Sequence, residues 1–467
     1  MRVLLVLVVY LLFLPFYTEA AIITVGPSDC SASAVNSAIS SATDGDTIRL
    51  SCTGTVTWNT TVTLPNTKGL TLQVQGGTNT PKTSGVFPLT ISSSADPIIR
   101  INCENSRSLN RVTGFKFRNT VASQNGAVFV QGRGTGTLGL GCFRIDNNFF
   151  DQIQMPHADL EGTLTVWSST GVLTGLIDNN TFQDCSWTDG YVIFVGERWQ
   201  YGGTGWPYAG QNAWTRPLGW GTRDFIFIED NLVSNTTRYA RHHIAAIQGA
   251  KYVARYNTFE SNVTNSGVQA ELVEAHGYCF CQSIGHGTRG GEIYGNTFQG
   301  TQVNYSVLLR GGSWLVYDNT WKTQPGAFMM LREYRAHSGG TRSCSQCDNT
   351  CPSDPSWGYC VVDSNGYPMR EQIGTNFQRM SEPSYFWNNL YLGVNRAPAV
   401  LSTSVIPQYI QSNRDFFSSA TKPASLSYTS YAYPHPLRNM TDPTAPPVST
   451  PPAPVNLRVS KLLGSQP

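Results

Sequence analysis

The sequence predicts an all-β protein that forms one parallel solenoid, in which coils of short strands stack along an axis. The main observation is a recurring phrase of Asn, Thr and an aromatic residue that follows short apolar runs. Close copies begin at Asn180, Asn257, Asn296 and Asn319, and looser copies begin at Asn119, Asn148, Asn231 and Asn389. The closest copies are about 25 residues apart, a period typical of folds that stack one structural unit per repeat. If each coil turns at its Asn, the amides are expected to hydrogen-bond from coil to coil as a ladder.

The composition is the second observation. Charged residues make up only 13% of the 467 residues, against roughly 25% in an average domain. Gly, Ser, Thr and Asn take their place, as a fold of strands and turns requires. The net charge of +2 gives no electrostatic basis for a nucleic-acid or anionic-membrane partner. The sequence also lacks a Gly-rich phosphate loop between a strand and a helix, which argues against nucleotide chemistry.

Residues 1–20 are predicted to be a signal peptide. Arg2 precedes an apolar run from Val3 to Leu14, and Ala20 is the expected cleavage site. The mature protein should therefore be secreted, with no membrane association after cleavage. Secretion suits the 11 cysteines, most of which are expected to form disulfides. Sequons for N-glycosylation stand at Asn59, Asn179, Asn235, Asn262, Asn304 and Asn439.

The N-terminal cap of the solenoid is predicted over residues 24–50. Apolar residues at helical spacing predict an amphipathic helix; they are Val35, Ala38, Ile39 and Ala42. A helix here would cover the strand edge that the first coil leaves unpaired. Cys30 and Cys52 either staple this cap or pair elsewhere, because connectivity cannot be read from sequence.

The solenoid domain is expected to span residues 21–440, with a Pro-rich tail over 441–467 and two loop insertions. A Trp-rich loop over 199–221 either packs on itself or stacks sugars on its rings. The candidate sugar-stacking residues are Trp199, Trp206, Trp214 and Trp220. A Cys-rich loop over 335–380 has Cys-x2-Cys spacing, for which disulfides are favoured over zinc in a secreted protein.

The Asn repeat, together with the helix and the Gly45-Asp46-Thr47-Ile48 turn, resembles the right-handed parallel β-helix of the pectin-lyase-like superfamily. The resemblance covers about residues 24–440 and implies a polysaccharide bound in a shallow groove on one side. The segments 383–389 and 431–437 resemble the C-terminal end of a group of secreted β-helix proteins of unassigned activity. Gly285-His286-Gly287 matches a polygalacturonase tripeptide, but the other motifs of those enzymes are missing, so the match is treated as chance. The resemblance therefore implies a fold rather than an activity.

Ionisable residues gather between residues 238 and 292 and on the strands that follow. Gln248 and Arg310 stand at the same distance before the Asn of their coils, which places them on one face. An outward stripe is expected to carry His243, Glu274, His276, Arg310 and Glu333, with Arg241 and Lys251 nearby. The stripe could equally consist of plain surface ion pairs.

Two reactions suit such a stripe. In β-elimination, His243 or Lys251 would be the base and Arg241 or Arg310 would neutralise the substrate carboxylate. In hydrolysis, Glu274 and Glu333 would flank the glycosidic bond. The sequence therefore predicts a secreted, monomeric lyase or glycoside hydrolase acting on an acidic polysaccharide. No metal ligands or other cofactors are expected, and Ca²⁺ is not indicated. The alternative is a non-catalytic β-helix that binds glycans or forms part of a cell surface or extracellular matrix.

Overall fold

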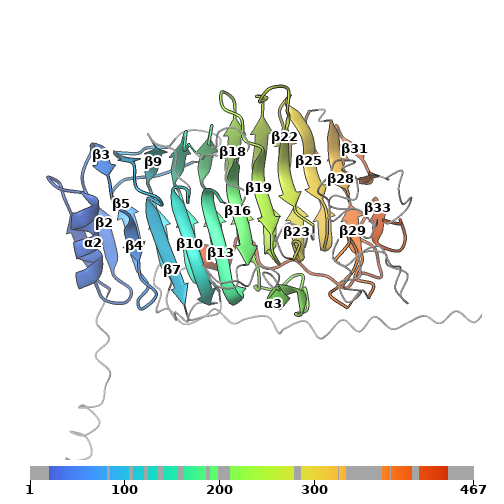
Figure 1. Cartoon of the computed structure of the whole chain (residues 1–467), viewed down its shortest axis with the longest axis horizontal. Helices are drawn as coiled ribbons and strands as arrows, with labels where there is room; N and C mark the ends of the chain where they lie inside the picture. The colour runs from blue at the N-terminus through green and yellow to red at the C-terminus, as the bar shows by residue number, and fades with distance from the viewer. Residues whose placement is uncertain are drawn as a thin grey trace, which may run out of the picture.

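The computed structural model describes residues 20–80, 85–104, 109–119, 125–134, 140–154, 161–185, 190–197, 211–277, 286–323, 326–332, 371–378, 380–401 and 410–439. These residues form a parallel β-helix, as the sequence predicts, with three long sheets of 12, 10 and 11 strands. The coils stack from the N-terminal to the C-terminal end of the elongated body (Figure 1). No helix among the described residues is long and apolar enough to cross a membrane.

Most coils contribute one strand to each sheet, and the strands pair in parallel except for the last two of sheet B, which are antiparallel. Sheet A holds β1 (Ile22–Val25), β2 (Thr47–Leu50), β5 (Thr71–Val74), β8 (Asn110–Thr113), β11 (Phe143–Asp146), β14 (Gly175–Asp178), β17 (Ile226–Glu229), β20 (Lys251–Arg255), β23 (Gly290–Tyr294), β26 (Ser313–Tyr317), β29 (Ser384–Trp387) and β33 (Phe416–Ser419). Sheet B holds β3 (Gly54–Trp58), β6 (Leu89–Ser93), β9 (Lys116–Asn119), β12 (Phe149–Asp151), β15 (Thr181–Gln183), β18 (Leu232–Asn235), β21 (Thr258–Ser261), β24 (Thr297–Gln299), β27 (Thr320–Trp321), β30 (Leu390–Tyr391) and β31 (Val394–Asn395). Sheet C holds β4 (Val62–Leu64), β7 (Ile99–Glu104), β10 (Val128–Gly134), β13 (Gly162–Leu173), β16 (Tyr191–Glu197), β19 (His242–Ile247), β22 (Ala270–Ala275), β25 (Val303–Leu309), β28 (Ala327–Leu331) and β32 (Ala399–Val400).

The predicted Asn ladder is present at the turn between sheets A and B. Asn231 donates from Nδ2 to Oδ1 of Asn257 at 3.0 Å, and Asn257 donates in the same way to Asn296 at 3.0 Å. The ladder runs through Asn148, Asn180, Asn231, Asn257, Asn296, Asn319 and Asn389. The residue before each ladder Asn is left-handed, for example Asp230 at φ 56°, which Asn and Asp adopt more readily than most residues. The copy at Asn119 is different, because Asn119 ends β9 and pairs with Ser93.

The aromatic residue of the phrase fills the interior. Phe150 and Phe182 stack with ring centroids 4.5 Å apart, and Phe298 and Trp321 stack at 4.9 Å. These rings have at most 1% of their surface exposed. Burying a side chain of this size contributes about 1.5–3 kcal/mol. The repeat therefore specifies the turn through its Asn and the core through the ring that follows.

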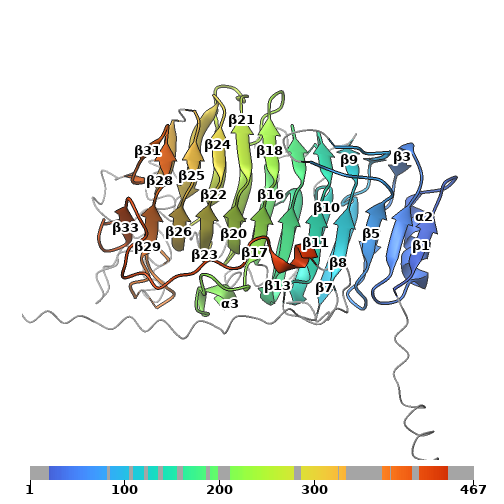
Figure 2. The same cartoon turned by 180° about the vertical axis from the view of Figure 1, so that it is seen from behind.

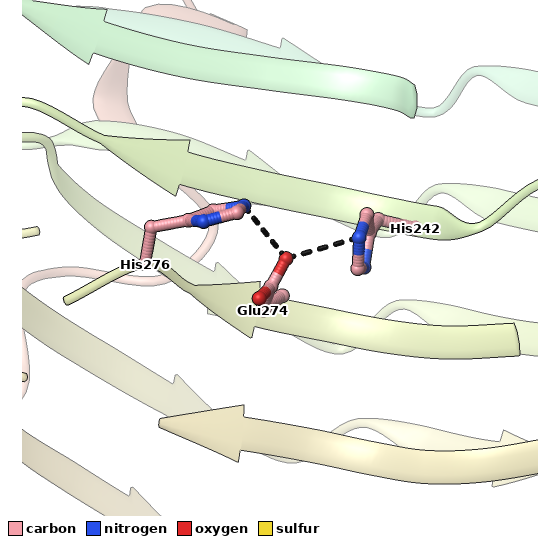
Figure 3. A group of neighbouring side chains, drawn as sticks. All are labelled: His242, Glu274 and His276. Atoms are coloured by element: carbon pink, nitrogen blue, oxygen red, sulfur yellow. Dashed lines mark ion pairs between the residues drawn. The ribbon is translucent and has the colours of Figure 1, made fainter. Parts of the chain in front are cut away.

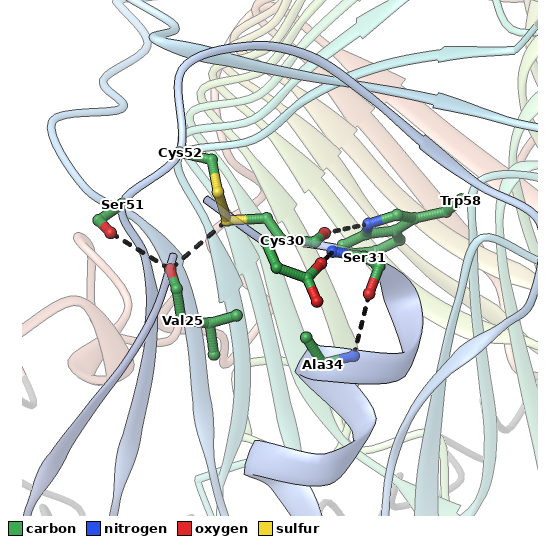
Figure 4. Close-up of a disulfide and its surroundings, with 8 residues drawn as sticks. Val25, Cys30, Ser31, Ala34, Ser51, Cys52 and Trp58 are labelled. Atoms are coloured by element: carbon green, nitrogen blue, oxygen red, sulfur yellow. Dashed lines mark hydrogen bonds between the residues drawn. A yellow bond between two sulfur atoms is a disulfide. The ribbon is translucent and has the colours of Figure 1, made fainter. Parts of the chain in front are cut away.

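The N-terminal cap is the predicted helix, α2 (Ala32–Ser41). Its buried face includes Val35, Ala38 and Ile39. The Ser31 side chain caps the helix by accepting from Ala34 N at 3.2 Å. Cys30 and Cys52 form a disulfide with Cα atoms 6.2 Å apart, beside Trp58 (Figure 4).

The other described cysteines are a second disulfide and one thiol. Cys103 and Cys142 are bonded, and Cys185 is buried without a disulfide. Burial is the main reason that the pKa of the Cys185 thiol rises to about 12, so the thiol is unreactive at neutral pH. The remaining six cysteines lie outside the described residues, and so does most of the predicted Cys-rich loop; they are Cys279, Cys281, Cys344, Cys347, Cys351 and Cys360.

The C-terminal segment runs back across the outer face of sheet A and ends at the 3-10 helix η4 (Pro436–Asn439) (Figure 2). Arg255 ties it down by donating to the carbonyl oxygens of Tyr431 and Ala432, each at 2.8 Å. Arg438 forms ion pairs with Glu229 at 2.7 Å and with Asp178 at 3.2 Å. We call this segment, residues 431–439, the strap. It lies on the outer face of sheet A, whereas sheet C forms the opposite side of the molecule, which faces the viewer in Figure 1.

Candidate active site on the outer face of sheet C

Backbone register brings five ionisable side chains together on sheet C. His242 in β19 pairs with Glu271 in β22, and Ala245 pairs with Glu274. Just past the strand ends, the amide of His276 donates to Ala246 O at 2.8 Å and the amide of Arg310 donates to Ala275 O at 3.0 Å. The parallel ladder thus continues through His276 and Arg310. We call His242, Glu271, Glu274, His276 and Arg310 the outer cluster.

Strict alternation of side chains fails in this part of sheet C, and this corrects the expected facing of His243. Leu272 and Val273 are consecutive, and both belong to the interior. His243 precedes Ile244 at the equivalent place in β19, is 0% exposed, and lies with its ring 6.1 Å from that of interior Phe259. Burial lowers the pKa of His243 to about 3. The outward histidine is its neighbour His242.

Glu274 is the centre of the outer cluster. Its Oε2 atom lies 3.0 Å from His242 Nε2 and 2.8 Å from His276 Nε2 (Figure 3). Its other oxygen, Oε1, lies 2.8 Å from Arg310 Nη2. Two imidazoles and one guanidinium therefore surround a carboxylate that is 0% exposed.

Glu271 supplies a second carboxylate at the edge of the cluster. Its Oε2 atom lies 3.2 Å from Arg310 Nη2 and 3.6 Å from His242 Nδ1. The side chains of Glu271, Arg310 and His276 keep 9%, 12% and 13% of their surface exposed. Solvent or a ligand can therefore reach the cluster on this side, whereas His242 and Glu274 are enclosed.

The electrostatics of the two carboxylates differ. Burial alone would raise the pKa of Glu274, but Arg310, His242 and His276 together hold it well below its usual value. Burial and the charge of Glu274 raise the pKa of Glu271, with Arg310 opposing them. Burial lowers the pKa of His242 to about 3, although Glu274 works against that shift. The geometry thus holds an ionised carboxylate next to a neutral imidazole.

Three arginines gather at the outer cluster: Arg310, which belongs to it, and Arg241 and Arg332, whose charges act on its members. We call these three residues the arginine rim. Arg332 continues the register of Arg310, because its amide donates to Leu309 O at 2.9 Å. Within the described part of the chain, no hydrogen bond or ion pair engages the Arg332 side chain, and its Nε atom is buried without an acceptor. Burial and the like charge of Arg310 lower its pKa. An arginine placed in this way is suited to bind an anion.

The remaining predicted catalytic residues fall in different places. Arg241 immediately precedes β19, and its charge acts on Glu271 and His242. Lys251 begins β20 on sheet A, where its ammonium lies 4.5 Å from the ring centre of Phe225. Burial lowers the pKa of Lys251 to about 8, but the register places the residue away from sheet C. Glu333 lies outside the described residues.

Only two of the four predicted sugar-stacking residues, Trp214 and Trp220, belong to the described part of the chain, and Trp214 is buried. Trp199 and Trp206 lie outside the described residues. Trp214 ends α3 (Gln211–Trp214), is 1% exposed, and donates from Nε1 to Gly287 O at 2.7 Å. Trp220 packs edge-on against Tyr385 at 6.3 Å. Within the described part, Trp214 is therefore a packing residue, and we leave it out of the candidate site.

His286 and Gly287, the two described residues of the tripeptide at 285–287, have a structural role. His286 Nδ1 contacts a carboxylate oxygen of Glu371, and Gly287 N donates to the other oxygen at 2.9 Å. Both side chains are buried. His286 therefore belongs to a packed corner next to Trp214 rather than to the outer cluster.

The fold and site together define a parallel β-helix protein with a histidine, carboxylate and arginine cluster on one outer face. No family model matches the chain, and no curated protein matches it. Among solved structures, the chain is similar to an alginate lyase from Paenibacillus sp. strain FPU-7, at 14% identity and a TM-score of 0.34. That likeness covers 65% of this chain and 96% of the lyase. A likeness of this size carries no argument about activity, so function has to be argued from the site.

Sequence reasoning missed His242, Glu271 and Arg332 as members of the site. The apolar doublet Leu272-Val273 between two glutamates was the available signal, because it marks where the strand turns two residues inward. Aligning β19 on β22 at that doublet would have selected His242 instead of His243. The predicted register of Gln248 with Arg310 was also one residue off: Ala246 pairs with Ala275 and Ala275 with Leu309, so Ile247 is the residue level with Arg310.

Proposed function

We propose that this protein is a secreted, monomeric member of the pectin-lyase-like superfamily that cleaves an acidic polysaccharide by β-elimination on the outer face of sheet C. One observation carries the proposal: Glu271 pairs with Arg310 at the exposed edge of an otherwise enclosed cluster, and Arg332 stands in register with Arg310 on the next strand. Two disulfides are compatible with export to an oxidising compartment.

The arginine rim supplies what elimination from a uronic acid needs first. Removing the proton next to a carboxylate places negative charge on that carboxylate, and the charge has to be stabilised. Arg332 has no carboxylate partner among the described residues and lies in register with Arg310. A uronate bound to Arg332 would form charge-assisted hydrogen bonds of the strongest kind found in proteins.

Glu271 is placed to act as the base. Its carboxylate reaches the exposed edge of the cluster, and Arg310 orients it through Oε2. It would take the proton from the carbon next to the uronate carboxylate. The electron pair left behind forms a carbon–carbon double bond as the glycosidic carbon–oxygen bond breaks. The leaving oxygen takes a proton from an acid, for which Tyr305 is placed in register beside Glu271.

Hydrolysis fits the geometry less well. It needs two carboxylates that both reach the glycosidic bond. Glu274 is fully buried and already contacted by Arg310 and two histidines, so it cannot reach a bound sugar. Of the two carboxylates in the outer cluster, only Glu271 is accessible, and it stands beside cationic side chains, as elimination requires.

The enclosure of His242 and Glu274 favours a second candidate function. In that alternative, the outer cluster only stabilises the fold, and the arginine rim binds an anionic glycan without cleaving it. Incubating the purified protein with a panel of uronic acid polymers separates the two. Cleavage by elimination gives an ultraviolet-absorbing unsaturated uronate, hydrolysis gives reducing ends without that absorbance, and binding alone gives neither. Retention of intact polymer with neither product would overturn the proposed lyase activity.

A further inference from the structure

His242 has more acceptors around it than a neutral imidazole can serve. Its Nδ1 atom lies 3.1 Å from the backbone oxygen of Glu271, and its Nε2 atom lies 3.0 Å from Oε2 of Glu274. Both neighbours are hydrogen-bond acceptors, but a neutral imidazole carries one N–H. A proton at Nδ1 leaves the Nε2 lone pair directed at a carboxylate. A cation between Nε2 and Oε2 would turn this repulsion into attraction.

A second proton on His242 is one way to supply that cation. The ring, however, has only 2% of its surface exposed, and a buried charge is costly without full compensation. Glu274 is the only described carboxylate within ion-pair distance of Nε2. A metal ion needs no second proton on the ring and uses the lone pair that is already aimed inward.

The geometry of the three side chains suits such an ion. One ring nitrogen of His242, one of His276 and a carboxylate oxygen of Glu274 all lie within 4.8 Å of one another. Both nitrogens point at the same oxygen, as Figure 3 shows. The hydrogen bond from His242 Nδ1 to a backbone oxygen fixes the ring and its tautomer, as is usual for metal-bound histidines. Arg310 holds the other oxygen of Glu274 and leaves Oε2 for the ion.

We propose that His242, Glu274 and His276 bind one divalent transition-metal ion of the zinc type. Two imidazole nitrogens and one carboxylate oxygen match the ligands that zinc prefers, with a fourth position left for water or substrate. Ca²⁺ and Mg²⁺ take oxygen ligands and would not select two histidines. The partly exposed His276 marks the side on which that fourth position opens.

This inference concerns the same cluster as the proposed function, and it places the ion next to the uronate that Arg332 would hold. An ion there would neutralise part of the charge that develops during elimination. Metal binding is measured without substrate, so it stands or falls separately from cleavage. If the protein binds the ion but cleaves no polymer, the metal site is supported and the proposed lyase activity is wrong.

The test uses the full chain, stripped with a chelator and titrated with Zn²⁺ or with Co²⁺ as a spectroscopic probe. We expect one ion per chain, a Co²⁺ spectrum without thiolate charge transfer, and a higher melting temperature for the loaded protein. His242→Gln and His276→Gln should each bind at least tenfold more weakly. His286→Gln is the matched control, because His286 is also a buried histidine in contact with a glutamate, and it should bind like the wild type.

Three results would overturn the inference: no ion binding by the wild type, equal binding by the wild type and both cluster variants, or equal loss in the His286→Gln control. The melting temperatures of the stripped proteins show whether each variant folds. If His242→Gln does not fold, His276→Gln carries the test alone, because His276 is the more exposed ligand.

Discussion

Arg310 and Glu274 form an ion pair on the outer face of the solenoid, with Nη2 of the arginine 2.8 Å from Oε1 of the glutamate. The glutamate is completely buried, and the arginine side chain is 12% exposed. The same guanidinium contacts Glu271. Arg310 therefore offsets two carboxylates that lie three residues apart on β22.

Arg310→Met should destabilise the fold strongly. Removing one partner of a buried ion pair typically costs about 3–5 kcal/mol, because the other charge stays buried and uncompensated. Urea denaturation measures the loss. The double variant Arg310→Met with Glu274→Gln should recover part of it, since the stranded charge is gone. Equal free energies of unfolding for wild type and Arg310→Met would show that the ion pair does not stabilise the fold.

Arg332→Gln should affect ligand binding and leave the fold intact. No described residue pairs with this side chain, so the unfolding free energy should change by less than about 0.5 kcal/mol. Affinity for a uronic acid polymer should fall about tenfold or more, because a charged hydrogen bond contributes about 1.5–3 kcal/mol. Isothermal titration calorimetry measures the affinity.

Arg100→Gln is the matched control for the arginine rim. Arg100 lies on β7 of the same sheet, where its guanidinium stacks 5.2 Å from the ring centre of Phe129. Its loss should leave polymer affinity unchanged. A similar drop in both variants would mean that the polymer responds to general charge rather than to the rim.

Asn257→Ala should cost about 2–4 kcal/mol of stability, since ladder neighbours on both sides lose partners and stay buried. Asn257 Oδ1 accepts from Asn231, and Asn257 Nδ2 donates to Ile228 O at 2.8 Å and to Asn296. Asn59→Ala is the control, because Asn59 is exposed and its side chain accepts one hydrogen bond, from Ser94, among the described residues. Thermal denaturation should show a lower melting temperature for Asn257→Ala and an unchanged one for Asn59→Ala. Equal shifts in the two variants would contradict a stabilising role of the ladder.

His435 should make the strap sensitive to acid. Burial, with Arg255, Arg144 and Arg438 nearby, holds the pKa of His435 well below 6.5. Its backbone amide donates to Glu229 at 3.1 Å, and its ring packs 4.6 Å from that of Phe227. Below pH 6.5 the unfolded chain binds a proton that the folded chain does not bind. The contribution of His435 to the free energy of unfolding is therefore fully present above pH 6.5. It is lost as the pH falls below that value, by up to about 1.4 kcal/mol for each pH unit.

His435→Asn tests this pH dependence, because Asn can still accept the hydrogen bond that Leu437 N donates to the histidine at 3.2 Å. The loss of stability between pH 7 and 5 should be smaller in the variant than in the wild type. Burial raises the pKa of nearby Asp178 to about 6, against Arg144; this group is present in both proteins, so its contribution largely cancels. If the free energy of unfolding falls equally with pH in the variant and the wild type, His435 is not the source of the acid sensitivity.

The fold could be predicted from sequence because its determinants are local and repeated. Each Asn is bonded to the equivalent Asn of the next coil, and the helical stripe at Val35 and Ile39 caps the end. Asn119 failed as a copy because its phrase ends a strand instead of following one.

The site was only partly predictable from sequence, because it depends on which side chains of a strand point outward and which point into the interior. Glu274, His276 and Arg310 were expected to meet, and the structure brings them together. His243 was chosen over His242 because simple alternation cannot detect a strand that turns two successive residues inward. The pairing of the two histidines through Glu274 depends on register between strands, which no single segment encodes.

The most direct test of the proposed elimination compares wild type with Glu271→Gln by ultraviolet absorbance during incubation with the uronic acid polymer that the wild type cleaves. Elimination at the outer cluster predicts a rise for the wild type and, for a folded Glu271→Gln, a rate at least about 100-fold lower, because the base is gone. A wild-type rate in Glu271→Gln, or no rise for the wild type with any uronic acid polymer, would contradict the proposed activity at this site.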